Sequence, residues 1–313
     1  MKHALLAAAL LAAPFPAAAS AIGPFSDLIV FGDSYSDGGN ASVLTAGTAE
    51  PQPNPLYYPN RQFTNGDVWA TKLGTTASLL GGTNYAVGGA EAVAESDDIS
   101  PDLTAQIGAF LGSAPALGAN PLAAIFIGGN DFREASTPEE AADEIVRVVN
   151  AIVGGVNTLL GAGIDTVAVF GLFDLGRFPE AVGTALQPAA TAASVAYNGA
   201  LRTALASTFA PDQTIFIDTF GIFENIFDDP SAYGLINTTD GCILTEPDPT
   251  QCRGDLGYFF QDNLHATDRV HQVLADAFAA QVTAAAVPLP AGFLLLLSGA
   301  GALALFRRRR AVP

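Results

Sequence analysis

Histidine and cysteine are scarce in this 313-residue chain, which has three of the first and two of the second. There is no HExxH pattern, and the two cysteines have no histidine near them, so no zinc site is predicted. The chain also lacks a P-loop and a GxSxG turn, and Gly161-Ala162-Gly163 precedes a strand-like run where a dinucleotide-binding turn would follow one. No motif therefore requires a metal or an organic cofactor.

Basic residues are also few. Lysine and arginine number 13 against 31 aspartates and glutamates, which gives a formal net charge of −18 at pH 7. Residues 1–19 and 287–313 hold Lys2 and Arg307–Arg310 but no acidic residue, so the body between them has 8 basic against 31 acidic residues, or −23. A surface this anionic repels phosphate backbones, so no nucleic-acid partner is predicted.

The N-terminal segment has the pattern of a secretory signal peptide. It begins with Lys2 and His3, continues as an apolar run rich in alanine and leucine, and ends in Ala17-Ala18-Ala19. Cleavage after Ala19 and cleavage after Ala21 fit equally well, and the run is short for a membrane anchor. Residues 1–19 are therefore predicted to be removed by signal peptidase once the body has crossed the cytoplasmic membrane.

A second apolar stretch lies at the C-terminal end. Val287-Pro288-Leu289-Pro290-Ala291 opens an uncharged run of twenty residues through Phe306, and Arg307–Arg310 follow. This ending resembles the VPLPA variety of the PEP-CTERM sorting signal of Gram-negative bacteria, which implies that an exosortase-type enzyme removes the tail, residues 287–313. A permanent transmembrane anchor is the alternative, since twenty residues barely span the hydrocarbon core. Both readings place the body outside the cytoplasmic membrane, secreted or on the cell surface.

Residues 25–286 alternate between strand-like and helix-like segments. Most of the strand-like runs are continuously apolar, as expected for parallel strands covered on both faces. The pattern predicts a single α/β domain of the doubly wound, three-layer α/β/α type with a mostly parallel, five-stranded sheet. The predicted strands are Leu28–Phe31, Asn84–Val87, Ala123–Ile127, Thr166–Phe170 and Thr214–Ile217.

Helices are predicted between these strands. Thr137-Pro138-Glu139-Glu140 combines an N-cap threonine, a proline at the first helical position and a capping-box glutamate, which predicts a helix to about Leu160. Two less regular helices are expected over Asp102–Leu111 and Pro188–Phe209. Thr267 is expected to cap a last helix, whose apolar stripe is Val270, Leu274, Phe278 and Val282. Residues 41–63 and 220–259 are predicted to be long irregular loops that flank the mouth of the site and set substrate preference.

Four short segments, far apart in the chain, carry reactive residue types. Ser34 follows the first predicted strand, at the edge where α/β folds place reactive groups. The segments are Gly32-Asp33-Ser34, Asn84-Tyr85-Ala86-Val87-Gly88-Gly89-Ala90, Phe126-Ile127-Gly128-Gly129-Asn130-Asp131 and Asp262-Asn263-Leu264-His265. In this order they resemble the four blocks of the GDSL, or SGNH, family of serine esterases and lipases. The resemblance implies a flavodoxin-like hydrolase fold, and the pattern from Phe31 to Asn40 is similar to the phospholipase, lecithinase and haemolysin branch.

A serine hydroxyl needs a base to become nucleophilic, and the body offers only His265 and His271. His265 lies three residues after Asp262, so a turn can bring the carboxylate to the imidazole nitrogen that faces away from Ser34. Ser34, His265 and Asp262 are therefore the predicted nucleophile, base and orienting acid. His271 is interpreted as structural, and Asp33 and Asp37 are expected to bond backbone within their turn.

The resemblance also implies three donors to the developing oxyanion: the backbone N–H groups of Ser34 and Gly89 and the side-chain amide of Asn130. Glycine lets backbone approach a substrate closely, and Asn130 follows a strand through two glycines. Gly88 is the competing residue in its block. A structural alternative for Asn130 is a turn residue that bonds its own backbone.

Cys242 and Cys252 lie close together in a segment rich in glycine and proline. In an exported protein this spacing predicts a short-loop disulfide, with two free thiols as the alternative.

The sequence thus predicts an exported esterase that cleaves carboxylic esters through an acyl-enzyme on Ser34, with acyl lipids as leading substrates. A polysaccharide O-acetyl esterase is the second hypothesis. A surface or matrix protein that uses the fold as a scaffold is the third.

Overall fold

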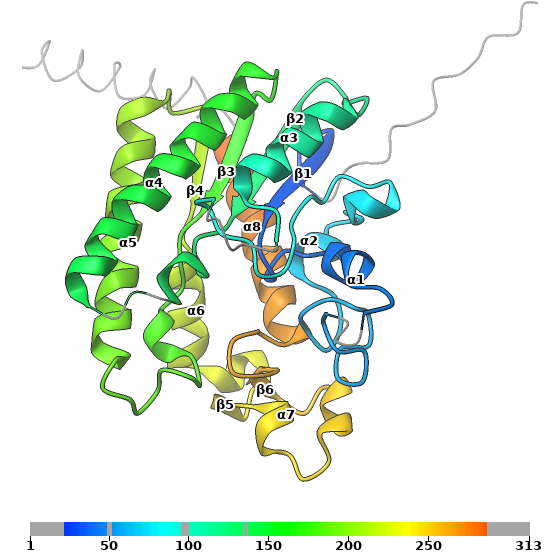
Figure 1. Ribbon diagram of the computed structural model, residues 1–313, viewed down its shortest axis with the longest axis vertical. Coiled ribbons are helices and arrows are strands. Elements are labelled where there is room, and N and C mark those ends of the chain that lie inside the picture. The colour runs from blue at the N-terminus through cyan, green and yellow to red at the C-terminus, as the bar shows by residue number, and fades with distance from the viewer. Residues whose placement is uncertain (1–21, 49–51, 95–99, 134, 136, 287–313) are drawn as a thin grey trace, which may run out of the picture.

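A computed structural model of the protein describes residues 22–48, 52–94, 100–133, 135 and 137–286. The predicted signal peptide (1–19) and sorting tail (287–313) lie outside the described residues. The expected hydrolase body, 25–286, is a single α/β domain with helices on both faces of a parallel sheet (Figure 1).

Within the described residues the main sheet has four parallel strands in the order β1-β2-β3-β4. Their register pairs Leu28 with Leu122, Ala123 with Val167 and Val167 with Thr214. Most of their residues are buried, as the continuous apolar runs predict. The strands are β1 (Asp27–Gly32), β2 (Pro121–Phe126), β3 (Thr166–Phe170) and β4 (Thr214–Ile217).

The predicted fifth strand, Asn84–Val87, extends the sheet at the free edge of β1 but in irregular form. The Tyr85 and Val87 N–H groups donate to carbonyls of β1 at 2.7 and 3.1 Å, and Val30 and Asn84 form an isolated parallel bridge. The ladder is interrupted because the Gly32 N–H, which a regular parallel ladder would pair with the Tyr85 carbonyl, donates to Gln106 Oε1 at 2.8 Å. With this segment beside β1, the chain order matches that of a flavodoxin-like sheet.

Alternate residues of the strands enter two separate apolar cores, one on each face of the sheet. Leu28 and Val30 face a core that includes Trp69 of α2 (Trp69–Lys72) and Phe278 of α8 (Asp268–Ala286). Ile29 and Phe31 face the other core. It is covered by α3 (Leu103–Ser113), α4 (Pro138–Gly161) and α5 (Gln187–Thr208). These two cores establish the three-layer arrangement (Figure 1).

Local signals fix the ends of several helices. Thr137 and Glu140 form the predicted reciprocal capping box, and α4 runs to Gly161. Asp102 caps α3 by accepting the Ala105 N–H at 2.8 Å. The apolar stripe predicted for α8 is buried. Thr267 directly precedes this helix, as predicted for its cap, but its hydroxyl donates to the Tyr258 carbonyl at 2.7 Å. Among the described residues, α4 is the one helix long and apolar enough to cross a membrane, judged by length and composition alone.

The prediction of an irregular loop over 220–259 is wrong. This stretch contains most of α6 (Thr219–Asp228), the two-stranded parallel sheet of β5 (Asn237–Gly241) and β6 (Tyr258–Phe260), and α7 (Cys242–Thr245). Short helical turns follow α6 and α7. Cys242 and Cys252 are joined in a disulfide with an S–S distance of 1.98 Å, which closes the connection between β5 and β6. In the described part of the first long segment, 41–48 and 52–63, the one helix is the short α1 (Asn40–Leu44), and the rest is irregular as predicted.

Candidate active site

Ser34 lies two residues after the end of β1, where the chain leaves the carboxyl edge of the sheet. Gly32 permits this departure, because a Cβ at that position would lie 2.2 Å from the Phe126 carbonyl oxygen. The next residue, Asp33, accepts the Tyr35 N–H at 2.9 Å and so closes a tight turn around the serine. This is the local backbone contact predicted for Asp33.

The structure brings Ser34, His265 and Asp262 together from the two ends of the domain. Ser34 Oγ lies 2.8 Å from His265 Nε2, and His265 Nδ1 lies 2.7 Å from Asp262 Oδ2. Hydroxyl, imidazole and carboxylate therefore form one continuous hydrogen-bonded chain. This arrangement allows the imidazole to take the serine proton while the carboxylate fixes its tautomer.

The other contacts of Asp262 hold it as a carboxylate. Its Oδ1 accepts the N–H groups of Leu264 and His265, each at 2.7 Å, and its Oδ2 also accepts the hydroxyl of Tyr58. Burial alone would raise the pKa of Asp262, but the attraction of His265 and these hydrogen bonds lower it to about 2. Asp262 therefore stays charged throughout the physiological range.

Tyr58 is a site residue that the sequence did not reveal. Its hydroxyl reaches Asp262 across 204 residues of sequence, from inside the segment predicted only as an irregular loop. Burial and the neighbouring Asp262 raise the pKa of the Tyr58 hydroxyl, so it remains a hydrogen-bond donor. The same segment contributes Phe63, whose ring centroid lies 5.0 Å from that of His265.

His271 is a structural residue, as predicted. Its side chain is fully enclosed, and its Nδ1 accepts the backbone N–H of Trp69 at 3.3 Å. Burial lowers its pKa to about 3, so the imidazole is neutral. It contacts the ring of Tyr35 with 5.7 Å between centroids, behind the site.

Asp37 links the serine turn to the Gly88-Gly89 segment. This buried carboxylate accepts the N–H groups of Gly39, Asn40 and Ala41 at 2.6–3.0 Å and that of Gly88 at 2.8 Å. The local bonds are those predicted for Asp37. The bond to Gly88 occupies the one backbone donor of that residue, which leaves Gly89 as the available donor of the pair.

Gly89 and Asn130 are neighbours through Ala90. The Asn130 side-chain amide donates to the Ala90 carbonyl at 2.9 Å, so it does not bond its own turn. Gly89 has a φ of +81°, which favours glycine, and its N–H has no hydrogen-bond partner among the described residues. Asn130 lines the same cavity as Ser34 and His265, whereas Gly89 lies outside the residues that line it.

The cavity beside Ser34 has a volume of about 610 Å³ and is predominantly apolar. Its walls come from the segments after β2 and β3, together with the first halves of α4 and α5. The segments 41–63 and 220–259 were predicted to flank the mouth of the site, and none of their described residues lines this cavity. The first of these segments supports the triad from behind through Tyr58 and Phe63.

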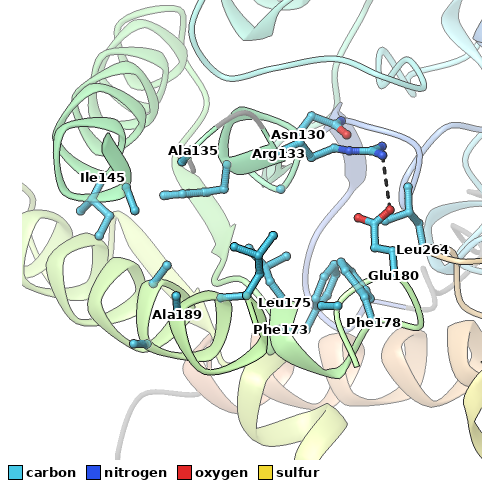
Figure 2. A pocket seen from close by; sticks show the side chains of 18 of the residues that line it. Asn130, Arg133, Ala135, Ile145, Phe173, Leu175, Phe178, Glu180, Ala189 and Leu264 are labelled. Atoms are coloured by element: carbon cyan, nitrogen blue, oxygen red, sulfur yellow. Dashed lines mark hydrogen bonds and ion pairs between the residues drawn. The ribbon is translucent and has the colours of Figure 1, made fainter. Parts of the chain in front are cut away.

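An ion pair between Arg133 and Glu180 lies at one end of this cavity (Figure 2). Arg133 Nη2 lies 3.4 Å from Glu180 Oε2, and the Asn263 side chain donates to the same oxygen at 2.9 Å. In Figure 2 this pair lies at the end that Asn130 and Leu264 mark, while Ile145 and Ala189 lie at the other end.

Two further buried carboxyls lie close to the site. Asp33 lines the cavity, and burial raises its pKa to about 7 although the Tyr35 N–H lowers it. Asp131 holds the segment after Gly89 by accepting the Ala92 and Val93 N–H groups at 3.0–3.1 Å. Burial raises its pKa to about 6. At neutral pH Asp33 is therefore only partly ionised, whereas Asp131 is mostly charged.

The chain matches the sequence model of one known protein family. The model of the GDSL-like lipase/acylhydrolase family matches residues 28–278, which include Ser34, Gly89, Asn130, Asp262 and His265. The chain belongs to this family. The predicted resemblance is thereby confirmed at the level of the family.

Several known proteins are similar to this GDSL-family chain. The phosphatidylcholine-sterol acyltransferase of Aeromonas hydrophila is 30% identical over 228 residues, 70% of this chain and 65% of that protein. Lipase 1 of Photorhabdus luminescens is 33% identical over 159 residues, 50% of this chain and 23% of that protein. The chain thus spans less than two thirds of the length of these relatives. The crystal structure of Axe2, an acetylxylan esterase from Geobacillus stearothermophilus, has a TM-score of 0.45 at 16% identity, covering 83% of this chain and 95% of that one.

Proposed function

We propose that this protein hydrolyses carboxylic esters through an acyl-enzyme on Ser34, with acyl lipids as its natural substrates. The observation that carries the proposal is the continuous chain of contacts from Ser34 Oγ through His265 to Asp262, at 2.8 and 2.7 Å. A protein that used the fold only as a scaffold would gain nothing from this alignment. The charged Asp262 and the neutral, hydrogen-bonded Tyr58 behind it serve the imidazolium that forms during the reaction.

The reaction has two halves. Ser34 Oγ attacks the ester carbonyl carbon while His265 Nε2 takes the hydroxyl proton, and a tetrahedral intermediate forms. The bond between this carbon and the alcohol oxygen breaks as His265 returns the proton to the alcohol. Water then attacks the acyl-serine, His265 takes its proton, and the acid leaves as Ser34 regains its hydrogen.

The oxyanion of each intermediate is assigned to three donors: the N–H groups of Ser34 and Gly89 and the Asn130 amide. Three observations support this set. The Gly88 donor is occupied by Asp37, the Gly89 donor is unoccupied among the described residues, and Asn130 faces the cavity from a fixed position. Each preorganised donor of this kind contributes about 10² to 10³ in kcat.

Acyl lipids are proposed over acetylated glycans because the cavity that begins at Ser34 is apolar and large. The names of the two relatives, a phosphatidylcholine-sterol acyltransferase and a lipase, point the same way. Polysaccharide deacetylation is the alternative activity. An alcohol that replaced water in the second half-reaction would make the same site an acyltransferase.

Export of the protein is part of the proposal. The pattern of residues 1–19 supports secretion, and a disulfide such as Cys242–Cys252 is typical of oxidising compartments. The intact mass of protein recovered from its native host should lack residues 1–19 and the sorting tail. Retention of the peptide that ends at Pro313 in the inner membrane would show that the tail is a permanent anchor.

Fluorophosphonate labelling tests the catalytic assignment. Wild-type protein should be labelled and should hydrolyse p-nitrophenyl esters, and Ser34→Ala should lose both properties while remaining folded. Labelling that persists in Ser34→Ala would identify another nucleophile. A wild-type protein that neither reacts nor hydrolyses any ester would favour the scaffold hypothesis.

A further inference from the structure

The two long helices beside the site pack tightly at only one of their ends. In α4 the buried residues begin at Val148, and none of residues 138–147 is buried. In α5 they begin at Ser194, and none of residues 187–193 is buried. The packed halves belong to one apolar core, so the first halves of both helices form the two walls of a cleft.

The walls of this cleft are apolar because of helical spacing. From α4 the lining residues recur at intervals of three and four, which places them on one helix face, and those from α5 are alanines. They are Pro138, Ala141, Ala142 and Ile145 of α4, and Ala189, Ala190, Ala192, Ala193 and Ala196 of α5. The acidic residues in the first turns of α4, such as Glu139 and Glu140, do not line the cleft. Alanine walls leave room for a long apolar group and offer it no hydrogen bond.

We propose that this cleft binds the acyl half of the ester, as an extended fatty acyl chain that runs from Ser34 toward Ile145. The assignment rests on the proposed hydrolysis at Ser34. A cavity of about 610 Å³ has room for on the order of twenty groups the size of a water molecule. An acetyl group would leave most of that space unfilled.

The position of His265 determines which half of the ester lies at which end of the cavity. His265 must return a proton to the alcohol oxygen, so the alcohol lies on the His265 side of the carbonyl carbon. Leu264, the neighbour of His265, lies with Asn130 at one end of the cavity, and Ile145 lies at the opposite end (Figure 2). The acyl chain therefore points into the cleft, and the alcohol points toward Arg133 and Glu180 at the polar end.

Ethyl octanoate and octyl acetate test this assignment directly, because they are isomers that differ only in which side of the ester carries the long chain. Each methylene that leaves water for an apolar site favours binding by about fourfold. We expect kcat/KM for ethyl octanoate to exceed that for octyl acetate by at least about tenfold, a conservative figure for an open cleft.

Substitutions in the two walls test whether the preference for ethyl octanoate arises in the cleft. Ala193→Phe in α5 and Ala142→Phe in α4 fill the cleft from opposite sides, and each should reduce the octanoate preference by about tenfold or more. Val195→Phe and Val146→Phe add the same ring at exposed positions outside the cleft on the same helices, and should leave the preference unchanged. Fluorophosphonate labelling of every variant shows that the serine site is formed, and a wall variant that fails to label is replaced by the one on the other wall.

The outcomes distinguish this assignment from the catalytic one. Hydrolysis with equal rates for the two isomers, or with octyl acetate preferred, would overturn the acyl-cleft assignment and leave esterase activity standing. An octanoate preference that survives both wall substitutions would place the chain elsewhere. Failure of the wild-type protein to label or to hydrolyse either isomer would overturn the proposed function and this inference with it.

Discussion

Tyr58→Phe should weaken the domain by removing one hydrogen bond from the carboxylate that orients His265. The phenylalanine keeps the ring and its packing, so the change is confined to the hydroxyl that donates to Asp262 Oδ2. Both side chains are buried, with 7% exposure each, so water cannot take the place of the lost donor. Hydrogen bonds to charged groups contribute about 1.5–3 kcal/mol, and the free energy of unfolding at pH 7 should fall by that amount.

The pH dependence of this loss follows from the pKa of Asp262. Its folded-state pKa is lowered to about 2, so the carboxylate contributes stability that is fully present above the unfolded pKa, near 4, and is lost as pH falls toward 2. Removing a donor to the charged form raises the folded pKa. The difference between wild type and Tyr58→Phe should therefore be constant from pH 7 to about pH 5 and should narrow at pH 3.

Urea unfolding at pH 7, 5 and 3 measures this difference, with Tyr57→Phe as the matched control. Tyr57 is the adjacent tyrosine, and its hydroxyl has no hydrogen bond among the described contacts, so its loss should cost no more than about 0.5 kcal/mol. The kcat of Tyr58→Phe should fall by less than about tenfold, because the three remaining donors still hold Asp262. A Tyr58→Phe protein as stable as wild type at pH 7 would show that the tyrosine does not support the carboxylate.

Four further variants probe the rest of the site and its surroundings. His265→Ala should lower kcat by at least about 10⁴, whereas His271→Ala should chiefly reduce stability, by about 1–3 kcal/mol in urea unfolding. Equal kinetic losses in the two folded variants would mean that His271 takes part in the reaction. Asn130→Ala should reduce kcat by about 10² to 10³ with a smaller change in KM, and an effect on KM alone would remove Asn130 from the oxyanion site. Replacing both Cys242 and Cys252 by serine should cost about 2–3 kcal/mol on the loop-entropy model, and thermal unfolding unchanged from wild type would show that the bridge does not constrain the unfolded chain.

Local patterns in the sequence were sufficient to predict most of the strands and helices of the fold. The strands Thr166–Phe170 and Thr214–Ile217 lie where continuous apolar runs predicted them, and the capping box placed the start of α4 at Thr137. The segment Asn84–Val87 has the right neighbour but an irregular ladder, because the Gln106 side chain accepts the Gly32 N–H that a regular ladder would use. No periodicity in the sequence encodes that competition.

The parts that were missed depend on contacts between distant segments. Ser34 and His265 could be identified because each sits in a short motif, but Tyr58 sits in none and meets Asp262 only when the domain is folded. The stretch 220–259 looked irregular because its strands are short and one of them, Asn237–Gly241, is polar. The two strands pair with each other only after a disulfide-closed connection. The cleft was invisible for a similar reason. The sequences of α4 and α5 give no sign that the first halves of these helices line a cavity.

In α4 and α5, the residues that stabilise the fold and the residues that line the cleft lie in different halves of each helix. None of residues 138–147 and 187–193 is buried, so most substitutions there should change stability by no more than about 0.5 kcal/mol, apart from those at Glu140 in the capping box and at Ile145, which packs against the core. A lineage can therefore alter the accepted acyl group stepwise without first acquiring stabilising mutations elsewhere. The same two half-helices are where a mutant library should be directed to obtain new ester preferences from an unchanged catalytic centre.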